Sequence, residues 1–465
     1  MALLRAVLAA AGPGRGLVLV GGAVRDALRG RPDADLDLAL PRGALALTER
    51  VAARLGATAV VLDAERGAGR VAGVGVQLDF NDFRAPTLEG DLAARDFTVN
   101  ALAVPLEPLL ATGRAPVVDP TGGLADLAAR RLRPAGPGVL LDDPLRALRA
   151  VRLEATLGLE LATAAARLVR AAAPGLARVA GERVRDELVV LLRLSATGRA
   201  LRRAEALGLL AVIMPEIGSM RAAAQPAPHR FHVLEHSLRA VEACDRLLPR
   251  LDALHPFGEE LAGHMAEALG GGLDRAAVLK LGALLHDVAK PETRRLVAGR
   301  VRFFEHDLIG ARRARAIGER WRLPERVVAL VERLVRYHLR PMHLAQAGEV
   351  TRRARYRFYR DLGPDTRDLL LLALVDAAAV TGASPLVVWR RAGLIRDLLG
   401  GWREAESAAA APPLLRGQDV MDRFGLSPGP VIGDLLARAR EAQDLGLVHT
   451  REEALAYLDS SAGDP

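Results

Sequence analysis

The segment "LVLVGGAVRDALRGRPDADLDLAL" spans residues 17–40 and decides the fold of the N-terminal part of the chain. An apolar strand stops at Gly21 and Gly22, and a second apolar run carries Asp35 and Asp37 one residue apart. Side chains at positions i and i+2 of a strand project to the same side, so the two carboxylates converge. Their mutual repulsion is costly unless a cation lies between them. The spacing therefore indicates a metal site, and a solvated strand face is the alternative interpretation.

Gly21 and Gly22 also separate this first strand from a helical stretch that begins at Ala23. Glycine lets the backbone approach a ligand closely, and free N–H groups at a helix start can bind phosphate. An ordinary tight turn explains the same two glycines. A third carboxylate, Asp79, lies in the strand-like run "VQLDFNDFR". Three strand carboxylates beside such a turn suit two divalent ions in nucleotidyl transfer, one for the attacking hydroxyl and one for the leaving pyrophosphate.

Composition sets the broad class of the protein. The chain has 465 residues, 50% of them apolar and 26% charged, which predicts a soluble globular protein of two to four domains. The formal net charge is +8, which favours an anionic partner such as nucleic acid. The single cysteine excludes an internal disulfide and a zinc cluster of cysteines. The N-terminal apolar stretch is short and no uncharged run reaches membrane-spanning length, so we expect a cytoplasmic protein without a targeting signal.

The periodicity of apolar residues changes along the chain. Strand-like runs and helical stretches such as residues 43–55 alternate up to Arg133, and helical patterns dominate from Leu140 onward. Two loops are expected, at residues 222–232 and 401–417. The sequence predicts an α+β protein: an α/β head with a small mixed sheet at 1–135, a helical neck at 136–220, a helical domain at 221–400 and a helical tail at 401–465.

Five ordered motifs resemble the class II nucleotidyltransferases, a family that contains CCA-adding tRNA nucleotidyltransferases and poly(A) polymerases. The motifs are "GGAVRD" (21–26), "DADLDLAL" (33–40), "ARDFTVNALAV" (94–104), "VVDPTGGLADL" (117–127) and "DDPLRALRAVR" (142–152). The resemblance implies template-independent addition of CCA from CTP and ATP to tRNA 3′ ends. It implies Mg²⁺ ligands at Asp35, Asp37 and Asp79. Addition of CC only, of A only or of a poly(A) tract remains an alternative within the family.

The resemblance also implies a set of nucleotide contacts. They come from Gly21, Gly22, Arg25, Asp26, Arg95, Asp96, Asn100, Asp143, Arg146, Arg149 and Arg152. Asp143 and Arg146 are three residues apart, which predicts one helical face that could read the amino group and ring acceptor of cytosine or adenine. A surface ion pair between them is the structural alternative. In the neck motif "GERVRDEL", Arg183 and Glu187 are four apart and predict an internal ion pair.

A second group of polar residues lies in apolar helical runs further along the chain. "LEHSL" contains His236, "LLHDVAK" contains adjacent His286 and Asp287, and "LALVDAAA" contains Asp376. A buried His-Asp pair requires a metal or hydrogen-bond partners.

Together these residues resemble the HD phosphohydrolase signature, which implies His236, His286, Asp287 and Asp376 as metal ligands. His306 and His338 fall where some members bind a second metal or a substrate phosphate.

The resemblance implies Ni²⁺, Mn²⁺, Co²⁺ or another divalent ion that supplies hydroxide for attack on a phosphoester. A subset of bacterial CCA-adding enzymes carries such a domain, which implies 2′,3′-cyclic phosphodiesterase or phosphatase activity on damaged RNA ends. Two alternatives stay open. The HD residues could form a structural metal site without activity, or they could be the principal site of a protein whose head only binds nucleotide. No obligate protein partner and no membrane association are expected.

Overall fold

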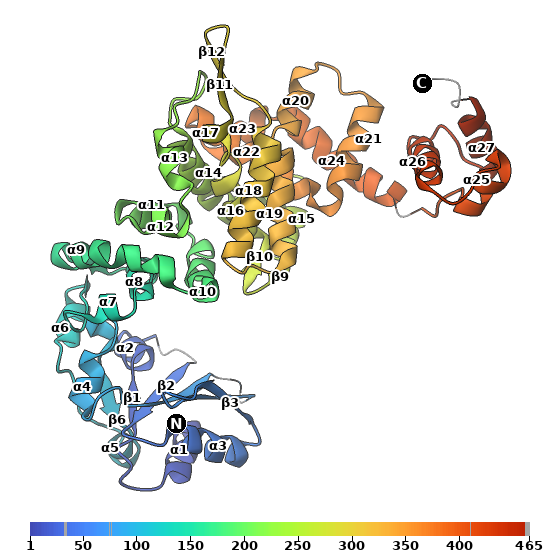
Figure 1. The fold of residues 1–465 in the computed structure, drawn as a ribbon. Helices are drawn as coiled ribbons and strands as arrows, with labels where there is room; N and C mark the ends of the chain where they lie inside the picture. The colour runs from blue at the N-terminus through green and yellow to red at the C-terminus, as the bar shows by residue number, and fades with distance from the viewer. Residues whose placement is uncertain (32–34, 74, 76, 410, 461–465) are drawn as a thin grey trace. The chain divides into compact units, whose positions relative to one another are not determined.

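The computed structural model describes residues 1–31, 35–73, 75, 77–409 and 411–460 (Figure 1). The chain divides into two compact units, and each is described by itself. Unit 1 comprises Met1–Glu187 and Arg203–Ile213, and unit 2 comprises Leu188–Arg202 and Met214–Pro465. The division falls inside two helices, α10 (Gly181–Leu192) and α11 (Thr197–Ala206).

A six-stranded mixed sheet forms the centre of unit 1. Its strands, in the order β3-β4-β5-β2-β1-β6, are β1 (Val18–Val20), β2 (Leu36–Leu40), β3 (Thr58–Asp63), β4 (Ala68–Ala72), β5 (Leu78–Asp82) and β6 (Ala103–Pro105). Strands β2 and β5 run parallel, and the other neighbouring pairs are antiparallel. The predicted small mixed sheet is confirmed.

Helices α1 (Ala2–Ala11) and α3 (Ala44–Leu55) contribute to the apolar core of the sheet domain. Leu4, Leu47 and Phe80 are buried together in this core. Helix α3 confirms the helix predicted at residues 43–55, and it ends at a glycine in the left-handed conformation, the usual residue for this type of helix end. Among the described helices, no single one is long and apolar enough to cross a membrane, and one bent pair passes that test by length and composition alone.

The remaining helices and short strands of unit 1 lie between the strands of the sheet and after it. They are α2 (Gly22–Leu28), α4 (Leu88–Ala93), η1 (Thr98–Asn100), α5 (Leu106–Thr112), α6 (Gly123–Ala128), β7 (Arg131–Leu132), α7 (Val139–Asp142), α8 (Leu145–Leu157), β8 (Glu160–Leu161), α9 (Thr163–Ala172), η2 (Ala173–Arg178) and α12 (Leu209–Ile213). The expectation that Asp143 shares a helical face with Arg146 was wrong. Asp143 is extended (φ −137°, ψ 95°) because Pro144 follows it, and α8 begins only after that proline.

Unit 2 is mostly helical. Its larger helices are α14 (Val233–Leu247), α16 (Arg275–Leu285), α18 (His306–Arg320), α19 (Glu325–Tyr337), α21 (Arg352–Leu362), α22 (Thr366–Thr381) and α24 (Gly393–Ala409). Two hairpins interrupt the helices: β9 (Ala268–Gly270) with β10 (Leu273–Asp274), and β11 (Arg294–Val297) with β12 (Arg300–Phe303).

The expected loop at 401–417 was wrong over its first nine residues. Helix α24 continues to Ala409 because Leu398, Leu399 and Trp402 bury one apolar face. The last helices, α25 (Gly417–Phe424), α26 (Pro430–Asp444) and α27 (Arg451–Ser460), pack around a small core of their own that includes Val420 and Leu458.

Candidate active sites in the two units

Three charged side chains lie in one row across the sheet of unit 1. Asp37 on β2 stands opposite Asp79 on the parallel strand β5, and Asp79 stands opposite Arg70 on β4. Arg70 donates two hydrogen bonds to the Asp79 carboxylate, of 2.7 and 2.8 Å. Because side chains paired in register lie on the same face of a sheet, the predicted carboxylates Asp37 and Asp79 are brought together, with Arg70 beside them.

Gly21 lies next to this row, at the end of β1. Its backbone has φ +71° and ψ −134°, a conformation essentially restricted to glycine. A Cβ atom at this position would lie 3.2 Å from Asp37 Oδ2 and 3.5 Å from Arg95 Nη1. A side chain at position 21 would therefore crowd the Asp37 carboxylate, and the backbone conformation there favours glycine. Arg95 itself donates to Asp91 at 3.0 Å.

The carboxylates of this face repel one another. Burial, opposed by Arg95 and reinforced by the charges of Asp79 and Asp35, raises the pKa of Asp37 above its ordinary value. Asp35 is exposed just before β2. Among the described residues, the three carboxylates do not each place an oxygen within 4.8 Å of the others. Carboxylate oxygens are ligands that fit Mg²⁺, and a bound cation would neutralise the repulsion between these like charges.

A hydrogen-bonded network joins six of the residues predicted to contact nucleotide. Arg25 binds the carboxylate of Asp26 and donates to Asn100 Oδ1 at 2.5 Å. Asn100 donates to Asp96 at 3.0 Å. The network continues through Arg149, which donates to Asp96 at 3.1 Å and to Glu187 at 3.3 Å, and through Arg152, which donates to Glu187 at 2.6 Å.

This network sets the charge state of Asp96. Burial opposes ionisation, but the Arg149 guanidinium and the hydrogen bond from Asn100 outweigh it and hold the pKa of Asp96 below its ordinary value. Asp96 is therefore an anchored carboxylate that fixes Arg149 and Asn100 in place.

The neck places its charged residues differently from the prediction. Arg183 does not pair with Glu187: its Nη2 lies 2.7 Å from Asp143 Oδ2, while Glu187 accepts from the two arginines of α8. Burial lowers the pKa of Arg146, and its Nη1 donates to the carbonyl oxygens of Ala94 and Val139 at 3.1 and 3.2 Å. Arg146 and Asp143 are 4.0 Å apart, at the limit of an ion pair.

In unit 2, the predicted metal ligands come from separate helices and meet in the interior. His236 lies on α14 and Asp376 on α22, while His286 and Asp287 follow the end of α16. His306 begins α18, and His338 follows the last residue of α19. The four histidines and Asp287 are all less than 9% exposed, so five strongly polar side chains share one buried volume.

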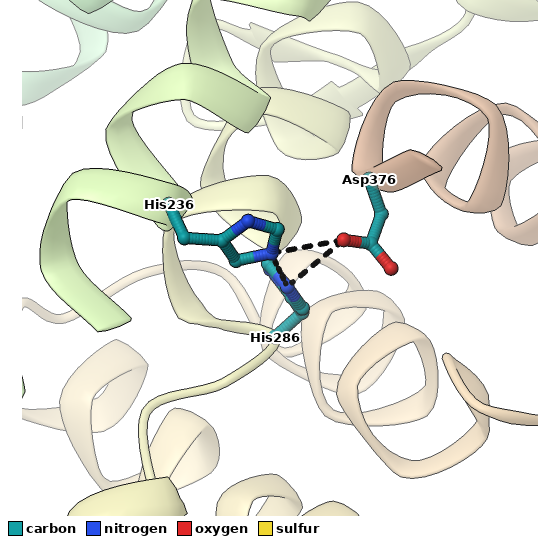
Figure 2. Close-up of side chains that lie close together, drawn as sticks. All are labelled: His236, His286 and Asp376. Atoms are coloured by element: carbon teal, nitrogen blue, oxygen red, sulfur yellow. Dashed lines mark hydrogen bonds and ion pairs between the residues drawn. The ribbon is translucent and has the colours of Figure 1, made fainter. Parts of the chain in front are cut away.

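The six side chains form two groups, each with its donor atoms within 4.8 Å of one another. The first consists of His236, His286 and Asp376, whose side chains point toward one another in Figure 2. His236 Nε2 lies 2.9 Å from Asp376 Oδ1 and 3.2 Å from His286 Nε2. The second group consists of Asp287, His306 and His338, with distances of 3.6 and 3.5 Å from Asp287 Oδ1 to the two Nε2 atoms.

Asp287 faces both groups, because its other oxygen, Oδ2, lies 3.2 Å from His286 Nε2. The same oxygen is 2.6 Å from Lys290 Nζ, and Lys290 also donates to Gln225 at 2.7 Å. The Asp287 carboxylate thus contacts both groups and the buried ammonium group of Lys290. Burial disfavours charge on His286, but the Asp287 carboxylate outweighs it and raises the pKa of His286 to about 9.

The histidines of unit 2 are oriented for metal binding. Nδ1 of His286, His306 and His338 lies 2.7–2.9 Å from a backbone carbonyl three residues earlier, so Nδ1 donates to that carbonyl and Nε2 is the nitrogen that faces the site. Nε2 of His306 and of His338 is buried without a hydrogen-bond partner among the described residues. Burial lowers the pKa of His306 to about 4, which keeps its imidazole neutral. These donors fit a divalent transition metal.

Comparison with known proteins now adds to this geometry. The family model "Poly A polymerase head domain" matches residues 17–133, "Probable RNA and SrmB- binding site of polymerase A" matches 158–220, and "HD domain" matches 233–380. An A-adding tRNA nucleotidyltransferase of Deinococcus radiodurans is 39% identical and covers 95% of both chains. A CC-adding tRNA nucleotidyltransferase of Thermus thermophilus is 36% identical over 94% of this chain and 92% of its own.

The chain belongs to the tRNA nucleotidyltransferase family. The fold agrees, because a solved CCA-adding enzyme in an apo form has a TM-score of 0.65, with 19% identity, over 100% of this chain and 94% of that one. The predicted resemblance and the predicted fold class are both confirmed, and the chain is a nucleotidyltransferase with an HD domain.

Three residues beside the sites of this nucleotidyltransferase were missed by the sequence argument: Arg70, Glu187 and Lys290. Arg70 lies nine residues before Asp79, a spacing that two strands of unknown register do not translate into a contact. Glu187 was assigned to an ion pair within its own helix, although its partners lie on α8. Lys290 had a usable signal, since it lies one helical turn after Asp287 and is one of only two lysines in the chain.

Proposed function

We propose that this protein transfers a nucleotide to the 3′ end of tRNA, using the sheet face of unit 1 as its catalytic centre. The observation that carries the proposal is the register of β2 and β5, which sets Asp37 opposite Asp79 beside the Gly21 turn. In this reaction the tRNA 3′ oxygen attacks the α-phosphorus, the bond to the β-phosphate breaks, and pyrophosphate leaves. Magnesium ions held by Asp35, Asp37 and Asp79 would neutralise charge on the triphosphate and favour ionisation of the attacking hydroxyl.

The chain's own residues would hold the nucleotide. The network from Arg25 through Asp96 and Arg149 to Glu187 presents fixed donors to an anionic ligand, with the Arg25 side chain folded toward Gly22. Fixed guanidinium groups bind phosphate with a smaller loss of side-chain entropy than free ones. We assign the triphosphate to Gly21, Gly22, Arg25 and Arg95. The ribose and base are assigned to the other predicted contacts from Asp96 onward, which are Asp96, Asn100, Asp143, Arg146, Arg149 and Arg152.

Addition of the terminal A is the activity we propose first, with full CCA addition and CC addition as the alternatives. The support for A is the 39% identity to an A-adding relative over nearly the whole chain. Asp143 and Arg146 remain the proposed base readers, although their atoms are occupied by Arg183 and by backbone carbonyls without a nucleotide. Adenine recognition would require Asp143 to exchange its Arg183 partner for the amino group of the base.

Three labelled tRNA substrates separate the alternatives: one that ends before the first C, one after one C, and one after two C. Each is incubated with CTP, with ATP and with both, in the presence of Mg²⁺. The proposal expects incorporation of a single A into the substrate that ends in CC and no growth of the other two. Completion of CCA on the shortest substrate would replace A addition by CCA addition, and a long A tract would indicate a poly(A) polymerase.

We also propose that the HD site of unit 2 hydrolyses a phosphoester at an RNA end, as a 2′,3′-cyclic phosphodiesterase or phosphatase. His236, His286 and Asp376 would hold one divalent ion, and Asp287, His306 and His338 a second, with Asp287 shared. Divalent ions in such a site supply hydroxide at neutral pH and neutralise the phosphate. Hydroxide forms a new bond to phosphorus, one ring P–O bond breaks, and the released 2′ or 3′ oxygen takes up a proton.

Hydrolysis of 2′,3′-cyclic AMP with added Mn²⁺ or Ni²⁺ tests this second activity. We expect turnover by the wild-type protein and none by His286→Ala. His264→Ala is a matched control, since His264 is a buried histidine of the same unit that pairs with Asp368 at 2.6 Å outside both groups. Unchanged turnover in His286→Ala would remove the proposal.

The domain limits follow the same proposal: a head at 1–135, a neck at 136–220, the HD domain at 221–400 and a tail at 401–465. Both activities would meet their RNA substrates in the cytoplasm, with CTP or ATP as the nucleotide donor.

A further inference from the structure

Hairpin β11–β12 concentrates positive charge beside the HD site. Residues 294–303 contain four arginines and no acidic residue. Figure 1 shows the hairpin projecting from the helices of its unit. The turn residues Ala298 and Gly299 both have positive φ, as in the tight two-residue turns that fix the register of a hairpin. The arginines are therefore held on a defined structure and are not part of an irregular loop.

The register places like charges against each other. Arg295 is directly opposite Arg302, and Arg300 lies two residues from Arg302 on the same face. Like charges directly opposite each other destabilise a strand pair. All three side chains are exposed, and no carboxylate of a described residue lies within ion-pair distance of them. The acidic residue Glu292, just before the hairpin, is already paired with Arg313 at 2.8 Å. This face is thus arranged for an anion from outside the chain.

The foot of the hairpin is part of the HD site. Phe303, the last residue of β12, accepts the Nδ1 hydrogen bond of His306 through its carbonyl oxygen at 2.9 Å. Its ring centre lies 5.6 Å from Nζ of Lys290, which contacts Asp287. Phe304 follows and is 56% exposed, a ring on which a base can stack. The strand that carries Arg300 and Arg302 therefore ends at the buried ligands, with Phe303 on the face of the hairpin opposite the arginines.

We infer that β11–β12 binds the backbone of an RNA strand and delivers its 3′ end to the HD site. This inference rests on the phosphohydrolase activity proposed above and specifies its substrate as an RNA chain, not a free nucleotide. Each strand of four residues is about 13 Å long, which spans more than one nucleotide of an extended chain. Three exposed guanidinium groups on one face of the hairpin can contact successive phosphates, and the adjacent ring adds contact with a base without sequence preference.

The test compares two substrates, a short single-stranded RNA ending in a 2′,3′-cyclic phosphate and 2′,3′-cyclic AMP. The main variant combines Arg295→Gln, Arg300→Gln and Arg302→Gln in the full chain. We expect kcat/KM on the RNA to fall by about tenfold or more, and the slope of its logarithm against log salt to become shallower by about 2, since about 0.7 is lost per phosphate contact on a single strand. Turnover of cyclic AMP should stay within about twofold of the wild type, because no hydrolytic group has changed.

A single-charge control uses the opposite face of the same hairpin. Arg294→Gln removes one exposed guanidinium. Arg294 lies opposite Phe303, on the other face from the three arginines of the main variant. It should reduce RNA turnover less than Arg302→Gln. Equal losses in these two variants, a parallel loss on cyclic AMP, or no loss in the triple variant would each overturn the inference.

Binding of the same RNA, measured by fluorescence anisotropy, separates the two proposals. If the wild-type protein hydrolyses neither substrate, the phosphohydrolase proposal fails, and delivery to an HD catalytic site fails with it. RNA binding by the hairpin then stands or falls by whether the triple variant weakens anisotropy binding with a shallower salt slope.

Discussion

The two candidate sites differ in how completely the folded chain assembles them. In unit 2, six ligand-type side chains lie in two groups within 4.8 Å, and carbonyl groups hold three imidazoles in the metal-binding tautomer. In unit 1, Asp37 and Asp79 share a sheet face, the three described carboxylates do not all come within that distance of one another, and Arg70 binds Asp79. Hydrogen bonds to carbonyl groups and to neighbouring side chains hold the ligands of unit 2 together, whereas the carboxylates of unit 1 repel one another. We therefore infer that the HD site is assembled by folding, and we expect cations and nucleotide to complete the head site.

The largest expected effect comes from Asp37→Ala. Asp37 would bind Mg²⁺ directly, so its removal should lower nucleotide addition by more than about a hundredfold. This loss exceeds the usual cost of removing a residue that only supports a metal ligand. Hydrolysis of 2′,3′-cyclic AMP should not change. Primer-extension assays on tRNA and phosphate release measure the two activities on one preparation. The comparison requires the two sites to act independently. Loss of both activities would therefore contradict it.

Glu187→Gln should have the next largest effect on the head. Glu187 holds Arg149 and Arg152, so its loss would leave the nucleotide-binding arginines less well placed and lower kcat/KM for the nucleotide by up to about a hundredfold. Asp186→Asn on the same helix is the control, since Asp186 is exposed and its ion pair within the described part of the chain is with neighbouring Arg185. If both variants add nucleotides as the wild type does, the network does not position the substrate.

Asp96→Asn tests the rigidity of the same network through stability. The folded-state pKa of Asp96 lies below the ordinary value of 3.8, so its ionised form stabilises the fold above that pH. We expect a loss of about 1–3 kcal/mol in the free energy of unfolding at pH 7. The difference from wild type should narrow as pH falls below 3.8 and Asp96 becomes protonated. Chemical denaturation at a series of pH values measures it, and a difference independent of pH would contradict the assignment.

The smallest effect is expected for Arg70→Ala. Arg70 and Mg²⁺ would compete for Asp79, so the Mg²⁺ concentration for half-maximal addition should fall by about two- to fivefold, the range for a partly exposed ion pair. Arg66→Ala is the control, because the Arg66 side chain is 85% exposed and pairs with Asp63, three residues earlier at the end of β3. An unchanged or higher Mg²⁺ requirement in Arg70→Ala would show that Arg70 supports the site and does not compete for it.

Sequence patterns predicted the parts of each site that depend on short spacing. Period-two alternation placed Asp37 and Asp79 on strands, and apolar helical runs isolated His236, His286 and Asp376. Contacts between segments that are distant in the sequence were harder to predict. The pairing of Glu187 with α8 depends on tertiary packing, which overrode the i, i+4 expectation.

The separation of Asp143 from the helix of Arg146 was predictable in principle from Pro144, because a residue before proline avoids helical geometry. The carbonyl partners of the histidines could not be predicted, since they depend on where each helix ends. Family resemblance supplied the roles of these residues, and the fold then supplied their distances.

The most direct test of the difference between the two sites is the metal content of the protein as purified, measured by mass spectrometry after extensive dialysis against metal-free buffer. A site built by folding should retain one or two transition-metal ions per chain, lost in His286→Ala and retained in Asp37→Ala. Retention of these ions in His286→Ala, or their loss in Asp37→Ala, would contradict the account.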